Sequence, residues 1–326
     1  MTAKTKLVYI CSLGCPKNLV DTEIMTGSLI KDGFGLTNNL SEADIFLINT
    51  CAFIAPAREE AEEYIRKAVA WKQKKSLIRK IVITGCLTNY DNIDSALIFK
   101  NKYPMVDIWL GVNECARLSE IIRKLDASNH DSQFFCERRP FYIYDEITPR
   151  LQLTPCHYAY VKISDGCSNK CSYCMIPHIR GNLRSRPINS IVNEVKSLTK
   201  DGKCLEIILI AQDTTAYGKD LQNNETNIVK LLEKLEKIEG DFKIRLMYAH
   251  PAHFTNELIN FYAKSEKLLH YAEIPVQHIS DRILKVMNRK ICSEKIKELI
   301  KKLRSAVPDI CIRTTLMTGY PGEQED

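Results

Sequence analysis

Three cysteines lie close together in the second half of the chain, in the stretch GCSNKCSYC. Cys167, Cys171 and Cys174 have the spacing C-x3-C-x2-C, and the residues around them are polar and typical of turns. Thiolates bind zinc, iron and copper. A structural zinc site takes four protein ligands, usually as two pairs, and the nearest histidines do not form a second pair. Four-iron clusters are commonly bound by four cysteines, so three cysteines leave one iron open to a substrate or cofactor.

Three more cysteines follow short apolar runs in the first half of the chain. Cys15, Cys51 and Cys86 close the runs KLVYICSLG, DIFLINT and KIVITG. If these runs are strands of an open parallel sheet, their carboxyl ends lie along one edge, where ligands bind. The three thiols would then converge from three loops and bind a metal centre, although free cysteine also occurs as a small buried apolar residue. Cys11 is an alternative to Cys15.

The composition fits thiol chemistry in a reducing compartment. The chain has 326 residues, of which 45% are hydrophobic, and its 13 cysteines are odd in number, which argues against a closed disulfide framework. The first residues lack the apolar core of a signal peptide, and no window approaches the roughly 18 uncharged residues of a membrane helix. We therefore expect a cytoplasmic protein without a membrane partner. The net charge of +6 is mild and does not by itself indicate a nucleic-acid surface.

Strands and helices alternate in the first half, which predicts an α/β domain with an open parallel sheet. Its fourth apolar run is VDIWLG. Residues 56–72 have a proline at the first helical position, acids early and bases late, and apolar residues on one side, which predicts a crossover helix. We place the N-terminal domain at residues 1–130. At residues 131–155 the periodicity stops, and we expect a linker with a short strand or two.

Residues 156–326 predict an incomplete (βα) barrel. The expected strands are HYAYVKIS, LEIILIAQ, KIRLMYAH, YAEIPVQ and CIRTTLMTG, separated by helical stretches such as NIVKLLEKLEKI. The loop with three cysteines follows the first of these strands. The sequence given stops at PGEQED, just after the fifth strand, so we expect the partial barrel to end before a sixth strand.

The cysteine loop resembles the signature of the radical S-adenosylmethionine (SAM) enzymes. Cys167, Cys171 and Cys174, with the aromatic Tyr173 before the last, match the motif that binds a 4Fe-4S cluster in that superfamily. There the open iron chelates the amino and carboxylate groups of SAM, and reductive cleavage yields a 5′-deoxyadenosyl radical. A zinc site or an electron-transfer cluster is the alternative for such a loop.

The resemblance extends to the methylthiotransferases within this superfamily. SLGCPKNLVDTE, INTCAFI and TGCL are similar to their N-terminal domain, whose three cysteines hold a second 4Fe-4S cluster; this assigns Cys15, Cys51 and Cys86 to that auxiliary cluster. CPKN and AQDTTAYG resemble the RimO type, which modifies the β-carbon of an aspartate in a small-subunit ribosomal protein. The alternative is a methylthiotransferase that modifies adenosine in tRNA. Such enzymes tend to carry Gln-Met-Asn where this chain has Pro16, Lys17 and Asn18.

Two features depart from the family pattern. Family members usually continue past the PGE turn into a sixth strand and a TRAM domain, and this chain stops before both, which leaves the activity of such a fragment open. A non-catalytic iron-sulfur protein is therefore a further alternative. The third cysteine of the first half is usually followed by an arginine-tyrosine pair, whereas this chain reads CLTNYD.

The resemblance implies a reaction that uses two molecules of SAM. One donates a methyl group to a sulfur associated with the auxiliary cluster, and the other gives the radical that removes hydrogen from the β-carbon of the aspartate. An electron donor such as flavodoxin or ferredoxin is implied as a partner. An unactivated C–H bond resists acid–base chemistry, so we expect no catalytic side-chain acid or base, and the protein supplies position and exclusion of water.

Polar residues in or beside the predicted barrel strands are candidates to contact SAM, in addition to Tyr173. Glu206 begins the second strand, where it would accept the ammonium group of SAM or face solvent. Gln212 ends the same strand, and polar residues at strand ends are often functional. Gln277 and Arg313 lie in apolar strands, so a buried partner or the cofactor must satisfy them. Arg313 suits a carboxylate.

Three arginines follow the cysteine loop. Arg180, Arg184 and Arg186 are expected to face either an acidic part of the substrate or water. The sequence favours neither alternative, although runs of charge usually form solvated faces.

The two cysteine sets predict the iron content. Anaerobic reconstitution should give about eight irons per chain, and the Cys167→Ala, Cys171→Ala, Cys174→Ala triple variant should keep about four. Iron and sulfide analysis measures both. A fall from about four irons to none would mean that the cysteines of the first half bind no cluster.

Overall fold

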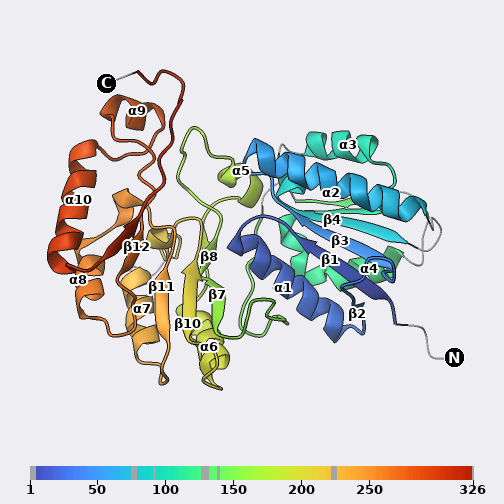
Figure 1. Cartoon of the computed structure of the whole chain (residues 1–326), viewed down its shortest axis with the longest axis horizontal. Coiled ribbons are helices and arrows are strands. Elements are labelled where there is room, and N and C mark those ends of the chain that lie inside the picture. Colours follow the sequence, from blue (N-terminus) through green and yellow to red (C-terminus); the bar gives the residue numbers. More distant parts are fainter. Residues whose placement is uncertain are drawn as a thin grey trace. The chain divides into compact units, whose positions relative to one another are not determined.

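The protein divides into two compact units, seen in a computed structural model (Figure 1). The structure describes residues 5–74, 79–90, 93–125, 132–137, 140–221 and 226–324, without the side chains of 93–97 and 125. The first unit comprises Met1–Leu153 together with His178–Gly181, and the second comprises Thr154–Pro177 and Asn182–Asp326. A short segment of the second half of the sequence is therefore part of the first unit.

The first unit is built on a parallel six-stranded sheet with the order β2-β1-β3-β4-β5-β6. The four apolar runs of the sequence form β1, β3, β4 and β5, as predicted. The short strands β2 and β6 extend the two edges. The bounds are β1 Leu7–Ser12, β2 Gly35–Leu36, β3 Ile45–Thr50, β4 Lys80–Gly85, β5 Ile108–Leu110 and β6 Gln133–Phe135. Strand β6 lies within the segment expected to be a linker with a short strand, of which residues 131 and 138–139 lie outside the described residues.

Helices cover both faces of this sheet. They are α1 Pro16–Lys31, α2 Ala55–Gln73, α3 Ile93–Lys102 and α4 Leu118–Leu125, with the 3-10 turns η1 Cys86–Asn89 and η2 Val112–Arg117. On one face, α1 and α4 pack over Val8, Leu47 and Val82. On the other, Trp71 of α2 packs edge-on against Phe46 of β3. Because it is covered on both sides, β3 is buried along its whole length. The helix predicted at 56–72 is α2 and is confirmed.

Residues 150–153 are attached to helix α1 by a buried ion pair. Arg150 donates to Glu23 Oε2 from Nε at 2.9 Å and from Nη2 at 2.5 Å, and the Leu153 amide donates to Oε1 at 2.8 Å. The Glu23 side chain is fully buried. Close contact continues at Gly27, where a Cβ atom would lie 2.6 Å from the backbone of Pro149. This end of the expected linker therefore packs as part of the first unit.

The second unit contains the five strands expected from the sequence. They are β7 Tyr158–Lys162, β10 Glu206–Ile210, β11 Lys243–Leu246, β12 Tyr271–Glu273 and β13 Cys311–Arg313. The sheet β11-β10-β7 and the pair β12-β13 are parallel, and an isolated bridge joins Ile244 to Leu268 between them. A small antiparallel ribbon of β8 (Ser164–Asp165) and β9 (Arg184–Ser185) lies beside the cysteine loop in the sequence. An open parallel sheet followed by an incomplete (βα) barrel is therefore confirmed.

Helices follow the strands of the second unit and cover its apolar core. They are α6 Ile188–Thr199, α7 Ile228–Glu236, α8 Asn256–Lys264, α9 Asp281–Val286 and α10 Ser293–Ala306, with η3 Thr214–Ala216 and η4 Pro251–His253. The short helix α5 Ile176–Arg180 ends within the segment 178–181 that belongs to the first unit. The core joins Val161 and Leu209 of the strands to Leu232, Leu258 and Leu299 of the helices. Among the described helices, we find none with the length and apolar character required to cross a membrane.

The pair of Glu23 and Arg150 predicts a large effect on stability. Arg150→Met should lower the free energy of unfolding by about 3–5 kcal/mol, because it leaves the Glu23 carboxylate buried without a counter-ion. Adding Glu23→Gln should restore part of this loss, since the glutamine carries no charge. Denaturant unfolding of the two single variants and the double variant measures the coupling. Additive losses would contradict the ion pair as the cause.

Candidate functional site

The three cysteines of the first unit follow three adjacent strands. Cys15 lies just beyond β1, and Cys51 and Cys86 directly follow β3 and β4. The strand order reverses between β1 and β3, because β2 lies on the outer side of β1. In open parallel sheets this switch point is where ligands bind, at the carboxyl ends of the strands. The placement expected from the sequence is therefore the one in the structure.

The three thiols lie near one another in a mostly buried site. Gly14 has φ +98°, and a Cβ atom there would lie 3.3 Å from Cys51 Sγ, so this position requires glycine. Burial raises the pKa of the Cys86 thiol to about 11; Arg180 opposes the rise, and the nearby thiols of Cys15 and Cys51 add to it. Burial also raises the pKa of Cys51, with Cys15 contributing. Buried thiols of this kind become thiolates readily only with a metal or a cation beside them.

The spacing of these thiols fits a cluster better than a single ion. Among the described residues, the group whose ligand atoms all lie within 4.8 Å of one another is Asp213, His250 and His253, and neither cysteine set is as compact. A four-iron cluster is bound through different irons and so requires ligands that lie further apart than around one ion. The donor set of three thiols therefore fits a four-iron cluster.

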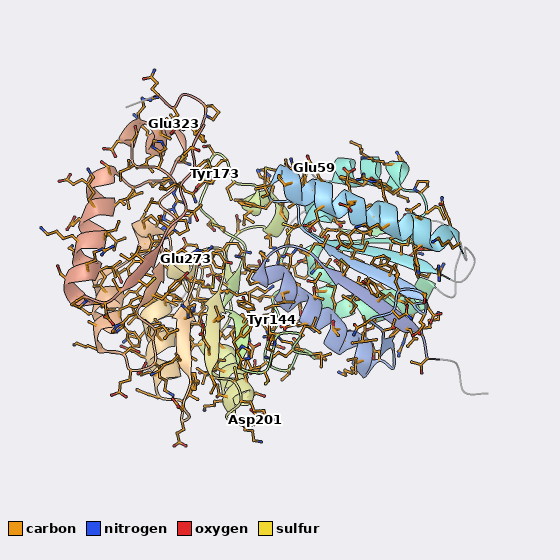
Figure 2. All side chains as sticks on the ribbon, viewed as in Figure 1. Glu59, Tyr144, Tyr173, Asp201, Glu273 and Glu323 are labelled. Carbon is orange, nitrogen blue, oxygen red and sulfur yellow. The ribbon has the colours of Figure 1, made fainter. Side chains whose placement is uncertain are left out.

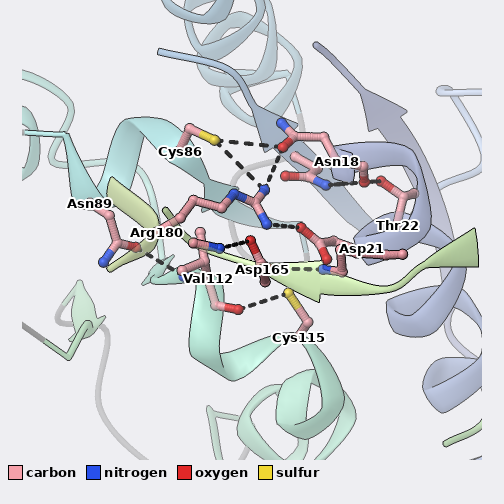
Figure 3. A network of polar contacts seen from close by, with 12 residues as sticks. Asn18, Asp21, Thr22, Cys86, Asn89, Val112, Cys115, Asp165 and Arg180 are labelled. Carbon is pink, nitrogen blue, oxygen red and sulfur yellow. Dashed lines mark hydrogen bonds and ion pairs between the residues drawn. The ribbon is translucent and has the colours of Figure 1, made fainter. Parts of the chain in front are cut away.

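Side chains at the start of α1 tie the three cysteine loops together, and Figure 3 shows the part of this network around Asn18, Cys86 and Arg180. Asn18 Nδ2 donates to the carbonyl groups of Leu13 at 3.1 Å and Thr50 at 2.9 Å, and its Oδ1 accepts from Cys86 Sγ at 3.5 Å. The Thr50 hydroxyl in turn donates to the Thr84 carbonyl at 2.6 Å. The loops after β1, β3 and β4 are therefore held by one polar network.

Arg180 completes this network from a distant part of the sequence. Its side chain is 2% exposed. Nη1 lies 2.8 Å from Asp21 Oδ2, and Nη2 donates to Asn18 Oδ1 at 2.6 Å and to Cys86 Sγ at 3.7 Å. Arg186 is also buried and pairs with Glu194 at 2.5 Å. The expectation that this arginine run faces a substrate or water is therefore wrong for Arg180 and Arg186.

The cysteines of the second unit lie in the loop after β8. The Cys174 amide donates to the Cys171 carbonyl at 3.1 Å, which closes a tight turn. Burial raises the pKa of Cys167 to about 11, and Asp213, Cys174 and Cys171 add to the rise. Burial also raises the pKa of Cys174, while the nearby Arg289 acts against it. The structure therefore brings these three thiols together as well.

The segment after α9 holds this loop in place. The Ser172 amide donates to the Met287 carbonyl at 3.1 Å, and Asn288 Nδ2 donates to the Lys170 carbonyl at 2.7 Å. Arg289, which is buried, donates from Nη1 to Cys171 Sγ at 3.7 Å. The loop that presents three thiols is thus fixed by main-chain contacts on both sides of Cys171.

Tyr173 lies within this loop (Figure 2). Its ring meets the Tyr320 ring edge-on at 6.5 Å, and its neighbour Ser172 shares a hydrogen bond of 2.7 Å with the Tyr320 hydroxyl. Burial raises the pKa of the Tyr173 hydroxyl, which Arg289 opposes and Cys171 increases. Its contact with SAM stays a prediction.

Two buried acceptors at strand ends have no hydrogen-bond partner among the described residues. Gln212 follows β10 and donates from Nε2 to Asp165 Oδ1 at 2.8 Å, while its Oε1 is unpartnered. Glu273 ends β12, and its Oε2 is likewise unpartnered (Figure 2). A buried polar atom without a partner costs free energy, so these acceptors fit a ligand that carries donors, such as the ammonium group of SAM. Sequence analysis missed Glu273, although a polar residue in an apolar strand was the signal used for Gln277.

The other three candidates have different surroundings. Gln277 has a left-handed backbone, φ +69°, which is rare outside glycine and is often found at functional sites. The Arg313 side chain is 60% exposed and lies 3.7 Å from Glu273 Oε1. Glu206 begins β10, at the edge opposite to the strand ends, and pairs with Arg245 at 2.6 Å. The structure thus gives Glu206 a protein partner in place of the ammonium group expected from the sequence.

An aspartate and two histidines form a polar cluster that the sequence did not predict. Asp213 Oδ2 lies 2.7 Å from His253 Nδ1 and accepts from Asn169 Nδ2 at 2.9 Å, and Oδ1 accepts from Thr215 at 2.6 Å. Burial is the largest single influence and would raise the pKa of Asp213, but the hydrogen bonds to His253 and Thr215 and the charge of the two histidines together outweigh it and lower the pKa to about 2. Asp213 directly follows Gln212, so the rule that polar residues at strand ends are often functional would also have identified Asp213.

Comparison with known proteins agrees with the two units. The Radical SAM superfamily matches residues 161–326, and the uncharacterized protein family UPF0004 matches residues 7–111. The ribosomal protein uS12 methylthiotransferase RimO of Caldicellulosiruptor saccharolyticus is 45% identical over 98% of this chain and 70% of its own length. The chain belongs to the RimO family of radical SAM methylthiotransferases. The proteins of that name from Dictyoglomus thermophilum and Syntrophus aciditrophicus are 44% and 41% identical, over 98% and 97% of this chain and 70% and 68% of their own lengths.

Solved structures support the fold of this RimO-family chain. The cobalamin-dependent SAM radical enzyme OxsB has a TM-score of 0.63 at 14% identity, over 96% of this chain and 49% of its own. The radical SAM methyltransferase TsrM from Kitasatospora setae has a TM-score of 0.63 at 12% identity, over 96% and 69%. Family membership also supplies the cofactors, which are two 4Fe-4S clusters and SAM.

His250 predicts a dependence of stability on pH. Burial, with Arg289 as the next cause, lowers its pKa from 6.5 to about 3 in the folded protein. Below pH 6.5 the unfolded chain therefore binds a proton that the folded chain does not, so stability falls as the pH falls. By about pH 5 the loss should approach roughly 2 kcal/mol.

The variant His250→Asn tests this, because asparagine can still accept the Ala252 amide, which donates to His250 Nδ1 at 3.2 Å. Urea unfolding between pH 6.5 and about 5 should show a smaller fall in the variant than in the wild type. Equal slopes would show that another group causes the loss.

Proposed function

We propose that this protein transfers a methylthio group to the β-carbon of an aspartate in ribosomal protein uS12. One observation carries the proposal: two separate sets of three convergent thiols lie in a chain that is 45% identical to a uS12 methylthiotransferase over 98% of its length. A radical SAM enzyme that does not transfer sulfur needs only the three cysteines of the second unit. The additional set in the first unit therefore favours a reaction that also transfers sulfur.

In the second unit, three thiolates would hold one cluster and leave its fourth iron open. The unpartnered acceptors Gln212 Oε1 and Glu273 Oε2 would orient the ammonium group of SAM by accepting its protons. Their burial excludes water, so each such hydrogen bond is stronger than it would be in solvent. Arg289 faces the Cys171 sulfur and offsets negative charge that gathers there.

In the first unit, Cys15, Cys51 and Cys86 would hold the auxiliary cluster. When bound, the clusters and SAM supply the methyl group, the sulfur and the radical that removes hydrogen from an unactivated carbon. The polar network of Asn18 and Thr50 holds the three loops at fixed positions, so the thiols are preorganised before any cluster binds.

The surroundings of the reaction follow from this proposal. The substrate is a ribosomal protein, which places the reaction in the cytoplasm. Reductive cleavage of SAM requires one electron at a time, so the proposal includes a one-electron donor such as a flavodoxin or a ferredoxin. The sequence alternative, a tRNA adenosine substrate, has no support from the curated relatives above.

Two cysteine variants separate the two halves of the reaction. Cys51→Ala should still cleave SAM to 5′-deoxyadenosine but should leave a uS12 substrate unmodified, because the auxiliary cluster loses a ligand. Cys171→Ala should abolish both activities. Chromatography of 5′-deoxyadenosine and mass spectrometry of uS12 measure the two products.

The control is Cys156→Ala, which changes an exposed cysteine outside both sets. It should retain both activities at the wild-type level. Methylthiolated uS12 formed by Cys51→Ala at the wild-type rate would refute the role of the first cysteine set. A wild-type protein that modifies tRNA and leaves uS12 unchanged would refute the substrate.

A further inference from the structure

We propose that Arg180 is a positioning residue of the auxiliary site, defined as Cys15, Cys51 and Cys86, and that its charge sets the reduction potential of the cluster bound there. The inference rests on the proposed cluster-binding role of these three cysteines. It concerns a residue from the arginine run that sequence analysis expected at the surface.

The contacts of Arg180 point to the thiols. In its guanidinium group, Nη1 lies 2.8 Å from Asp21 Oδ2, and Nη2 donates a hydrogen bond to Asn18 Oδ1 at 2.6 Å. The same Nη2 atom lies 3.7 Å from the Cys86 sulfur, within the range of a weak hydrogen bond to sulfur. Asn18 in turn accepts from the Cys86 thiol, so arginine, asparagine and cysteine form a closed triangle.

The position of Arg180 has no simple structural explanation elsewhere in the first unit. A fully buried arginine is costly unless its charge and its donors are matched. Asp21 matches the charge, but buried ion pairs in proteins can often be replaced by hydrophobic pairs without loss of stability. The segment His178–Gly181 packs as part of the first unit although its neighbours in the sequence belong to the second. The buried charge of Arg180 is explained if it acts on the cluster that Cys15, Cys51 and Cys86 bind.

Electrostatics gives the direction of the effect. Three thiolates and a cluster carry net negative charge, and reduction adds one more electron. A buried positive charge beside a ligand sulfur stabilises the reduced form more than the oxidised form, since a buried charge is poorly screened. Hydrogen bonds to ligand sulfur act in the same direction on the potential of iron-sulfur clusters. The structure therefore assigns Arg180 the effect of raising the reduction potential.

Asp21 should have the opposite effect. Its carboxylate is buried on the far side of the guanidinium and carries a negative charge into the same site. Asp21→Asn removes that charge and keeps an oxygen that can accept from Arg180. Replacing Arg180 by Met and Asp21 by Asn therefore changes the net charge of the site in opposite directions.

The experiment uses the full chain with Cys167→Ala, Cys171→Ala and Cys174→Ala, so that only the auxiliary cluster remains. Into this background we introduce Arg180→Met, Arg180→Lys and Asp21→Asn, and measure iron content and the midpoint potential by redox titration followed by electron paramagnetic resonance. Arg180→Met should make the midpoint potential more negative, and Asp21→Asn should make it more positive. Arg180→Lys should lie between Arg180→Met and the parent, because it keeps the charge and loses the planar fork.

A matched control is Arg79→Met. Arg79 is also a buried arginine of the first unit; it donates to the Trp71 carbonyl at 2.6 Å and precedes β4, whereas Cys86 follows that strand. The strand spans six residues at about 3.3 Å each, so Arg79 lies about 20 Å from Cys86, where a charge interacts several times more weakly than at the contact distance of Arg180. Its loss should leave the potential unchanged.

The outcomes distinguish this inference from the proposed function. No iron in the parent triple variant would refute the auxiliary cluster and the inference with it. A full cluster whose potential is the same in Arg180→Met and Asp21→Asn would refute the inference alone. Shifts of the same sign in both variants would also refute it, because a merely structural role predicts no opposite signs. If Arg180→Met binds no iron, the midpoint potential of Asp21→Asn decides: a more positive potential supports the inference, and an unchanged or more negative one refutes it.

Discussion

The parallel direction of the strands is the constraint on which the cysteine site of the first unit and the strand-end acceptors of the second unit depend. Parallel strands all end at the same edge of a sheet, so residues far apart in the sequence meet there without further long-range contacts. In the first unit this edge brings together the loops after β1, β3 and β4, and in the second it places Gln212 and Glu273 at the ends of β10 and β12. An antiparallel arrangement would send alternate strand ends to opposite edges and separate the same residues.

Burial is the second constraint, and it opposes the first. Thiols that converge in a buried site resist ionisation, and the raised pKa values of Cys86 and Cys167 express this cost. Iron binds the thiolate, so each site must offset the cost of making it. Both sites contain a buried arginine within 3.7 Å of one ligand sulfur, Arg180 in the first unit and Arg289 in the second. The same solution thus occurs in two unrelated folds of one chain.

Local sequence patterns predicted the strands, the crossover helix and the cysteine loop of the second unit, because each depends on residues that are neighbours in the chain. The cysteines of the first unit are far apart in the sequence, and their convergence was predicted from the strands that they follow. Strand β2 has two residues and carries too few apolar positions to show a period. The environment of Arg180 is not a local property, since its partner Asn18 lies 162 residues away. Glu206 shows another limit: its position in a strand was evident, but the partner Arg245 comes from the next strand of the sheet.

The position of residues 178–181 has a consequence for how the molecule is made. A ribosome completes all three cysteines of the first unit and reaches residue 153 before it synthesises Arg180. Until then the Arg180 guanidinium that pairs with Asp21 is missing, so the first unit cannot reach its final state during synthesis of residues 1–153 alone. The segment 154–177, with the thiols of the second unit, must be made in between. The two units are therefore completed together, and a gene cut at the boundary between them would yield a first half that lacks part of its own core.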